Sequence, residues 1–158
     1  MAGALPENAL IDRAFVSLYQ TSGSNTDNHL VSLHRVLQDW SEGTAYSSGG
    51  GGAPASEGDV TWLHTNYEME YWVKEGGHFI ANDSSSEMVG DRGFYTWQDS
   101  VHLVNDVRLW LHAPQQNFGW LVMGDEDTLQ SAKRFASREG PEEEQRPVLT
   151  IEYHLPGE

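Results

Sequence analysis

The sequence of 158 residues contains no cysteine. Disulfide frameworks, thiol nucleophiles and cysteine-ligated metal centres are therefore excluded. Long apolar runs are also missing, because no stretch approaches the roughly 18 apolar residues of a membrane-spanning helix. The first residues, MAGALPENALIDRAF, show neither the basic segment nor the long apolar segment of a signal peptide. We therefore expect no membrane insertion.

Basic residues are scarce in this chain. Nine lysines and arginines stand against 24 aspartates and glutamates, which gives a formal net charge of −15. Such a charge repels phosphate backbones and anionic lipid, so neither nucleic acid nor a membrane surface is an expected partner. It attracts divalent cations, and calcium in particular binds carboxylate oxygens. A solvated acidic surface without metal explains the same composition.

Recognisable catalytic motifs are absent as well. The seven histidines form no H-x-H or H-E-x-x-H pattern, and the sequence has no G-x-S-x-G element, phosphate-binding loop or dinucleotide fingerprint. No organic cofactor is expected. A pair of carboxylates for glycoside hydrolysis stays open, because such pairs meet in space and not in sequence.

Glycine and bulky aromatics are abundant, with 16 glycines, 6 tryptophans and 6 tyrosines. This composition is typical of a β-protein with many turns. Alternation of apolar and polar residues predicts strands in AFVSLY (14–19), LVSLHRV (30–36) and VLTIEYHL (148–155). Further strands are expected at residues 59–64, 67–73, 92–97, 118–124 and 133–138.

One segment follows helical spacing instead. Apolar residues in DSVHLVNDVRLWLH recur every three or four positions, which predicts a short helix near residues 100–112. Asp99 or Ser100 is suited to cap its start, and Pro114 prevents its continuation.

Glycine, serine and charge mark the expected loops at residues 46–59, 82–91 and 139–147. The triple glutamate, residues 142–144, falls in the last of these loops, where like charges cost little. Seven or eight short strands and one helix predict a single domain over residues 1–158. The expected fold is all-β, an antiparallel two-sheet β-sandwich of jelly-roll-like type.

A family resemblance follows from the order of several elements along the chain. These elements are LHRVLQDWSEGT, DVTWL, YWVKEGG, FYTW, NFGWLVMGDE, RFASRE and RPVLTIEY. Their order resembles the DNRLRE domain, a β-sandwich module of exported proteins that is related to carbohydrate-binding modules. The resemblance runs from about Ala14 to Tyr153 and implies an extracellular or cell-surface location. Members of that family usually carry further strands before the segment matched by IDRAFVSLY, so we expect the first strands to be lacking and sheet edges to be open.

The aromatic residues offer a candidate glycan site. An indole ring packs its face against the C–H bonds of a sugar while the sugar hydroxyls stay hydrogen-bonded. In YEMEYWVKEGG, strand alternation places Trp72 on one face with Glu68, Glu70 and Lys74, which indicates the solvent side. Trp72, Glu70 and Lys74 are therefore the predicted ligand-binding residues. The alternative is that Trp72 belongs to the core.

Two charged elements of the resemblance predict structural contacts. They are Arg138 and Glu139 in the S-R-E element, and Trp40 and Glu42 in the W-S-E-G element. The planar guanidinium of Arg138 suits a carboxylate, and we expect a buried or half-buried salt bridge from Arg138 to Glu42. The alternative is a ligand clamp.

Carboxylates are densest in the loop GDEDT, residues 124–128. Asp125, Glu126 and Asp127 are the best candidates for a structural calcium, which the analogy to related sandwich modules also implies. The chain lacks the spaced loop of a calcium-binding hand.

The leading hypothesis for function is a non-catalytic cell-surface module that binds a polysaccharide or glycan. A neutral glycan is favoured, because the chain is strongly acidic. Two alternatives remain. One is a structural subunit that self-associates through open sheet edges by exchanging a strand, with residues 1–20 as the donor. The other is a polysaccharide-degrading enzyme, which rests on fold analogy alone.

Overall fold

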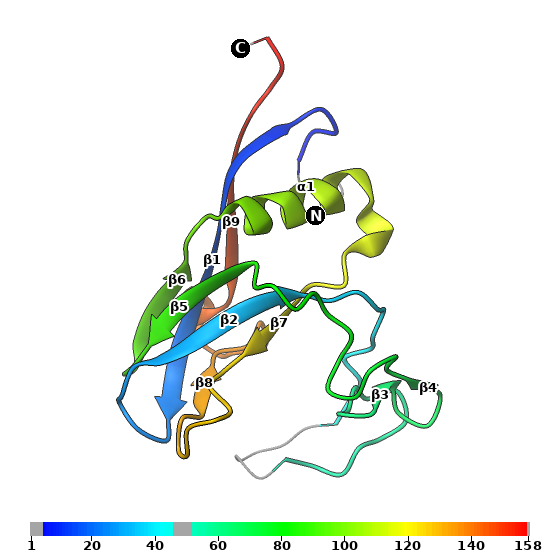
Figure 1. Cartoon of the computed structure of the whole chain (residues 1–158), viewed down its shortest axis with the longest axis vertical. Helices are drawn as coiled ribbons and strands as arrows, with labels where there is room; N and C mark the ends of the chain where they lie inside the picture. The colour runs from blue at the N-terminus through cyan, green and yellow to red at the C-terminus, as the bar shows by residue number, and fades with distance from the viewer. Residues whose placement is uncertain (1–4, 46–51, 158) are drawn as a thin grey trace.

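The computed structural model describes residues 5–45 and 52–157. Within these residues it shows antiparallel sheets of four, three and two strands and one α-helix (Figure 1). The two larger sheets share one hydrophobic core, which confirms the expected all-β, sandwich-like fold.

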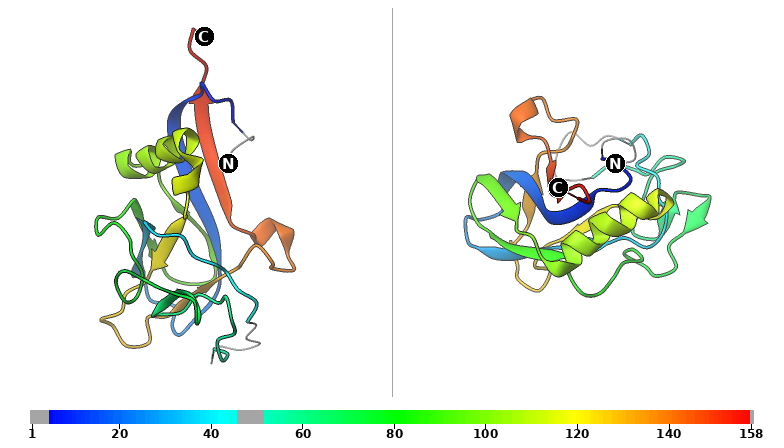
Figure 2. Two further views of the ribbon diagram at one scale, coloured as in Figure 1. Left: turned by 90° about the vertical axis from the view of Figure 1, so that its right-hand side faces the viewer. Right: turned by 90° about the horizontal axis from the view of Figure 1, so that it is seen from above.

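The larger sheet is built around β1 (Leu10–Gly23). On one side β1 pairs with β6 (Gly93–Trp97), and on the other with β9 (Val148–His154) and then with β8 (Lys133–Phe135). Figure 2 shows β1 and β9 running side by side over most of their length. Alternate residues of β1 are buried, as the period of two in the sequence predicts.

The three-stranded sheet is built around β2 (His29–Arg35). It pairs with β5 (Ser85–Val89) on one side and with β7 (Trp120–Met123) on the other. A short turn joins β5 to β6, so it connects an edge of this sheet to an edge of the larger one (Figure 1). The strand β7 lies at the opposite edge.

The helix α1 (Val101–His112) packs against β1 and covers one end of the core. The Ser100 hydroxyl accepts a hydrogen bond of 3.0 Å from the backbone N–H of Leu103, which makes Ser100 the N-cap. Pro114 follows the helix and opens the 3₁₀ turn η1 (Pro114–Gln116). The predicted helix and its stop signal are therefore confirmed, and Figure 2 shows the helix lying across the strands.

Three secondary-structure predictions are wrong. Residues 59–64 and 67–73 form no sandwich strands, and only the small hairpin of β3 (His64–Asn66) and β4 (Glu70–Tyr71) is found there. The predicted loop 82–91 contains β5. Its serines resemble a loop in sequence, but Ser85 is buried and its hydroxyl donates to the carbonyl of Gln98 at 2.8 Å. Pairing with β2 overrides the local propensity.

The charged segment 139–147 is a connection, as predicted. It holds one 3₁₀ turn, η2 (Glu143–Gln145), whose residues are not buried, and leads into β9. In the described part of the chain, no helix is both long enough and apolar enough to cross a lipid bilayer.

Candidate functional site

The hairpin of β3 and β4 exposes different side chains from those that the sequence predicts. Strand alternation places Met69, Tyr71 and Val73 in the core, yet all three are exposed, whereas Trp72 is half-buried. The reason is the tight turn of the hairpin, in which Glu68 adopts a positive φ of 67°. A period of two does not persist through such a turn. The prediction that Trp72 is an exposed platform is therefore wrong.

Trp72 instead holds the loop that carries Trp62. Its indole N–H donates to the carbonyl of Thr61 at 3.0 Å, and its backbone N–H donates to the carbonyl of Leu63 at 3.0 Å. The carbonyl of Trp62 accepts a bond of 2.8 Å from the N–H of Gly76. Three successive carbonyls are thus fixed, which pre-organises the position of Trp62.

Trp62 is exposed, with 64% of its surface accessible. Its ring lies against the backbone of Gly76, where an added Cβ would stand 2.7 Å from the Cη2 atom of Trp62. Gly76 also has a positive φ of 83°. Both features require glycine at this position.

A groove of about 330 Å³ runs beside Trp62. Lys74, Glu75 and Glu126 give it charged groups. Its remaining lining is mostly apolar and comprises Trp62, Gly76, Phe79, Leu121, Val122, Met123 and Gly124. We call this the Trp62 groove.

The predicted ligand-binding residues are not brought together. Lys74 lines the Trp62 groove, Trp72 supports it from behind, and Glu70 lines a different cavity. Sequence reasoning missed Trp62, because alternation in DVTWLH indicates a core strand. The signal that identifies Trp62 is the pair Gly76 and Gly77, which lets the chain turn tightly against its ring.

The chain that leads to Trp62 is fixed by the buried carboxylate of Asp59. It accepts backbone N–H bonds from Thr44 at 2.7 Å, Ala45 at 3.0 Å and Ser56 at 2.6 Å. These bonds, of which the one from Ser56 is strongest, lower the pKa of Asp59 below its usual value of 3.8. A Cβ on Gly43 would meet the Asp59 Oδ1 atom at 2.0 Å, which explains the glycine of the W-S-E-G element.

Acid is expected to weaken the fold through Asp59. Because the pKa of this carboxyl is lowered in the folded state, its stabilising contribution is complete above 3.8 and is lost as the pH falls below that value. Urea unfolding at a series of pH values from about 6 down to about 3 measures the effect. At the upper end of this pH range, Asp59→Asn should have a lower free energy of unfolding than the unaltered chain. Its free energy of unfolding should also decrease less steeply as the pH falls. Asp27→Asn, in an exposed loop, is the control, and an equal flattening by both variants would contradict the assignment to Asp59.

The predicted contact between Arg138 and Glu42 is present. The Nη2 atom of Arg138 lies 2.6 Å from a carboxylate oxygen of Glu42, and its Nε atom lies 3.0 Å from Glu139. The predicted burial is wrong, since the side chains of Arg138 and Glu42 are 71% and 60% exposed. The indole N–H of Trp40 donates to the carbonyl of Phe118 at 2.8 Å. These residues tie loops together at the surface.

The acidic loop after β7 directs its first carboxylate inward to the protein. Asp125 lies 3.1 Å from the Nδ1 atom of His29 and accepts backbone N–H bonds of 3.1 Å from Asp127 and Thr128. Hydrogen bonds from Thr128 and then His29 lower the pKa of Asp125. Across residues 5–45 and 52–157, no cluster of three or more His, Cys, Asp or Glu side chains is found. Calcium at Asp125, Glu126 and Asp127 thus stays a prediction from sequence.

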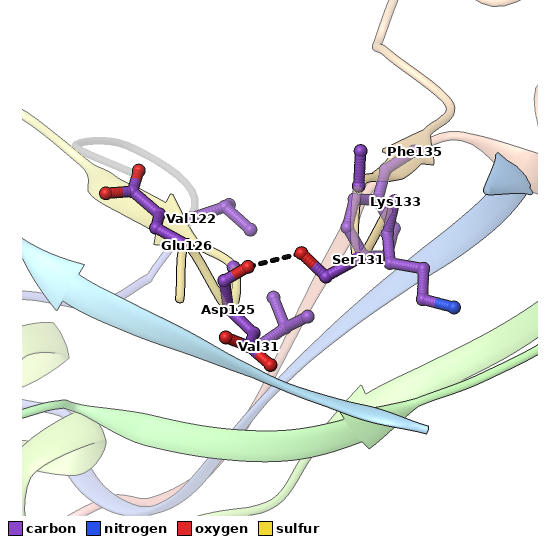
Figure 3. A pocket seen from close by; sticks show the side chains of 9 residues that line it. Val31, Val122, Asp125, Glu126, Ser131, Lys133 and Phe135 are labelled. Carbon is purple, nitrogen blue, oxygen red and sulfur yellow. Dashed lines mark hydrogen bonds between the residues drawn. The ribbon is translucent and has the colours of Figure 1, made fainter. Parts of the chain in front are cut away.

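The sandwich is open between β7 and β8. A cavity of about 450 Å³ lies there, with Val31, Val122 and Phe135 among its walls (Figure 3). Among the described residues β7 pairs with β2 alone, so its outer edge is free to pair with a further strand. Residues 10–20, part of the predicted donor, form the central strand β1 and are committed to the fold of their own chain.

The Trp62 groove has the chemistry to hold a ligand with one apolar face and several hydroxyl groups. Its indole supplies the apolar contact, the ammonium of Lys74 donates hydrogen bonds, and the carboxylates of Glu75 and Glu126 accept them. No family model, curated protein or solved structure matches the chain.

Proposed function

We propose that the chain is a non-catalytic β-sandwich module that binds a neutral glycan in the Trp62 groove. The observation that carries the proposal is the exposed indole of Trp62, held rigidly at the side of a 330 Å³ groove that also contains charged hydrogen-bonding groups. The resemblance to the DNRLRE domain supports the same function and an extracellular or cell-surface location.

The fixed position of the Trp62 ring favours glycan binding. A flat ring that is already fixed loses little conformational entropy when a sugar packs on it. Trp72 and Gly76 provide this fixation through their bonds to the carbonyls of residues 61–63. The net charge of −15 disfavours an anionic polysaccharide, which leaves neutral glycans as the expected class.

Replacement of Trp62 by alanine is expected to abolish most glycan binding. Loss of a central aromatic contact should weaken affinity by roughly 10- to 100-fold. Native electrophoresis in gels containing neutral polysaccharides, including β-glucans, mannans and xylans, would first identify a glycan that retards the unaltered chain. Titration calorimetry with oligosaccharides of that glycan would then compare the variants.

Phe94→Ala is the matched control for this experiment. Phe94 is an exposed aromatic residue on β6, outside the Trp62 groove, so its removal should leave glycan affinity unchanged. If none of the polysaccharides retards the unaltered chain, the proposed function is wrong. If Trp62→Ala binds as well as Phe94→Ala, the glycan site lies elsewhere.

A further inference from the structure

A second, smaller cavity lies between the chain after β2 and the hairpin of β3 and β4. Its volume is about 110 Å³. The residues that line it are Asp39, Trp40, Ser41, Thr65, Asn66 and Glu70. Five of these six side chains carry oxygen, and none of the six is basic. We call this the oxygen-lined cavity.

Two of its oxygens are buried without a partner. Thr65 is fully buried, with an exposed fraction of 0%, and its Oγ1 atom has no hydrogen-bond partner among the described residues. The Oδ1 atom of Asn66 is likewise buried and unpartnered. Buried polar atoms in native proteins are almost always satisfied, so these two neighbouring atoms require a partner such as a water or an ion.

The backbone explains how adjacent residues line one cavity. In a regular strand Thr65 and Asn66 would point to opposite faces. Here the pairing of β3 with β4 shifts register between His64 and Asn66, so that Asn66 lies opposite Glu70. Thr65, Asn66 and Glu70 all line the cavity.

The two carboxylates of the cavity have no counter-charge. Among the described residues neither Asp39 nor Glu70 takes part in a salt bridge. One oxygen of Asp39 accepts the backbone N–H of Trp40 at 3.0 Å, which leaves the other available. The Ser41 hydroxyl donates its proton to the carbonyl of Gly58 and keeps its lone pairs.

We propose that the oxygen-lined cavity binds a calcium ion through Asp39, Ser41, Thr65, Asn66 and Glu70. Calcium takes about six to eight oxygen ligands in a flexible arrangement, and waters would complete the set. The absence of nitrogen and sulfur donors among these five residues disfavours zinc. Magnesium demands a stricter octahedral geometry and gives up its waters reluctantly, so the mixed and irregular donors favour calcium.

A calcium ion here would join the segment after β2 to the hairpin of β3 and β4. Asp39 and Ser41 belong to the first element, whereas Thr65, Asn66 and Glu70 belong to the second. The two elements are also joined by hydrogen bonds from the Ser41 N–H to the Thr65 carbonyl, of 3.0 Å, and from the Gln38 amide to the Tyr71 carbonyl, also of 3.0 Å. The proposal is independent of glycan binding, because none of its residues lines the Trp62 groove.

Terbium luminescence provides a direct test. Terbium replaces calcium at oxygen sites and emits when a neighbouring tryptophan is excited, and Trp40 lines the cavity. We expect sensitised emission from the unaltered chain, displaced by calcium with a Kd of about 10⁻⁴–10⁻³ M, the range of extracellular modules. Asp39→Asn and Glu70→Gln should each weaken calcium binding at least tenfold, whereas Asp127→Asn should not.

Thermal unfolding provides a second test, because bound calcium should raise the Tm. In 10 mM calcium the Tm should exceed that in chelator by about 3–10 °C, and sodium chloride of equal ionic strength should not reproduce the gain. Thr65→Val removes the unpartnered hydroxyl, so it should raise the Tm in chelator and reduce the gain from calcium.

Three results would overturn the proposal. The first is the absence of calcium-displaceable emission from the unaltered chain. The second is emission that survives Asp39→Asn and is lost in Asp127→Asn, which would move the site to the acidic loop after β7. The third is a calcium-dependent gain in Tm that is the same in Thr65→Val and Glu70→Gln as in the unaltered chain.

Discussion

Trp97→Ala is expected to destabilise the protein by about 3–5 kcal/mol, which is the usual cost of removing a fully buried tryptophan. Trp97 lies on β6, has no exposed surface and packs edge-on against Phe135 with ring centroids 5.8 Å apart. Its indole N–H also donates to the carbonyl of Val31 on β2 at 2.8 Å. A single side chain therefore fills the core and joins the two sheets.

Denaturant unfolding would measure this loss. Because folded domains are typically stable by only about 5–15 kcal/mol, Trp97→Ala should come close to unfolding at room temperature. Trp97→Phe keeps most of the ring and loses the bond to Val31, so a smaller cost of roughly 1–3 kcal/mol is expected. Phe94→Ala, on the exposed face of the same strand, is the control. Equal effects of Trp97→Ala and Phe94→Ala would contradict the assigned role of Trp97.

Asp106→Ala should produce the second large effect. The carboxylate of Asp106, on α1, lies 2.8 Å from the Nε atom of Arg35 on β2. It also accepts hydrogen bonds from the hydroxyl of Ser84 at 2.6 Å and the indole N–H of Trp120 at 2.8 Å. Removal leaves a partly buried guanidinium and two donors unpaired, which typically costs about 3–5 kcal/mol.

Thermal unfolding should show a fall in Tm of about 10 °C for Asp106→Ala. Glu42→Ala is the matched control, since it also removes a carboxylate paired with an arginine, Arg138, but at the surface. Exposed pairs contribute about 0–1 kcal/mol, so its Tm should change little. A fall as large in Glu42→Ala as in Asp106→Ala would show that burial of the Asp106 network does not determine its importance.

Strands with clean alternation were predictable from sequence. The segments around Val16, Val31 and Ile151 lie in β1, β2 and β9, and the helix with its Ser100 cap is where its spacing predicts. These elements have one buried face each, so local pattern and tertiary structure agree. The contact between Arg138 and Glu42 was also predictable, although its exposure was not.

The surroundings of the Trp62 groove were not predictable in this way. Over residues 36–45 and 52–80, side chains such as Trp72 and Asp59 hold the chain through hydrogen bonds with backbone groups. Such contacts leave no periodic signal in the sequence. The strand β5 was not predicted for a different reason. Its residues gain hydrogen-bond partners only when β2 and Gln98 are in place.

The pairing of β1 with β9 has a consequence for how the protein is made. Leu10 lies opposite His154, so the central strand finds one of its neighbours only at the far end of the described chain. During synthesis from the N-terminus, the larger sheet stays incomplete until residues 148–154 have left the ribosome. Closing so long a loop before its contacts form makes folding slow. Over that interval the apolar side of β1 is unprotected, which makes the nascent chain prone to aggregate until β9 is in place.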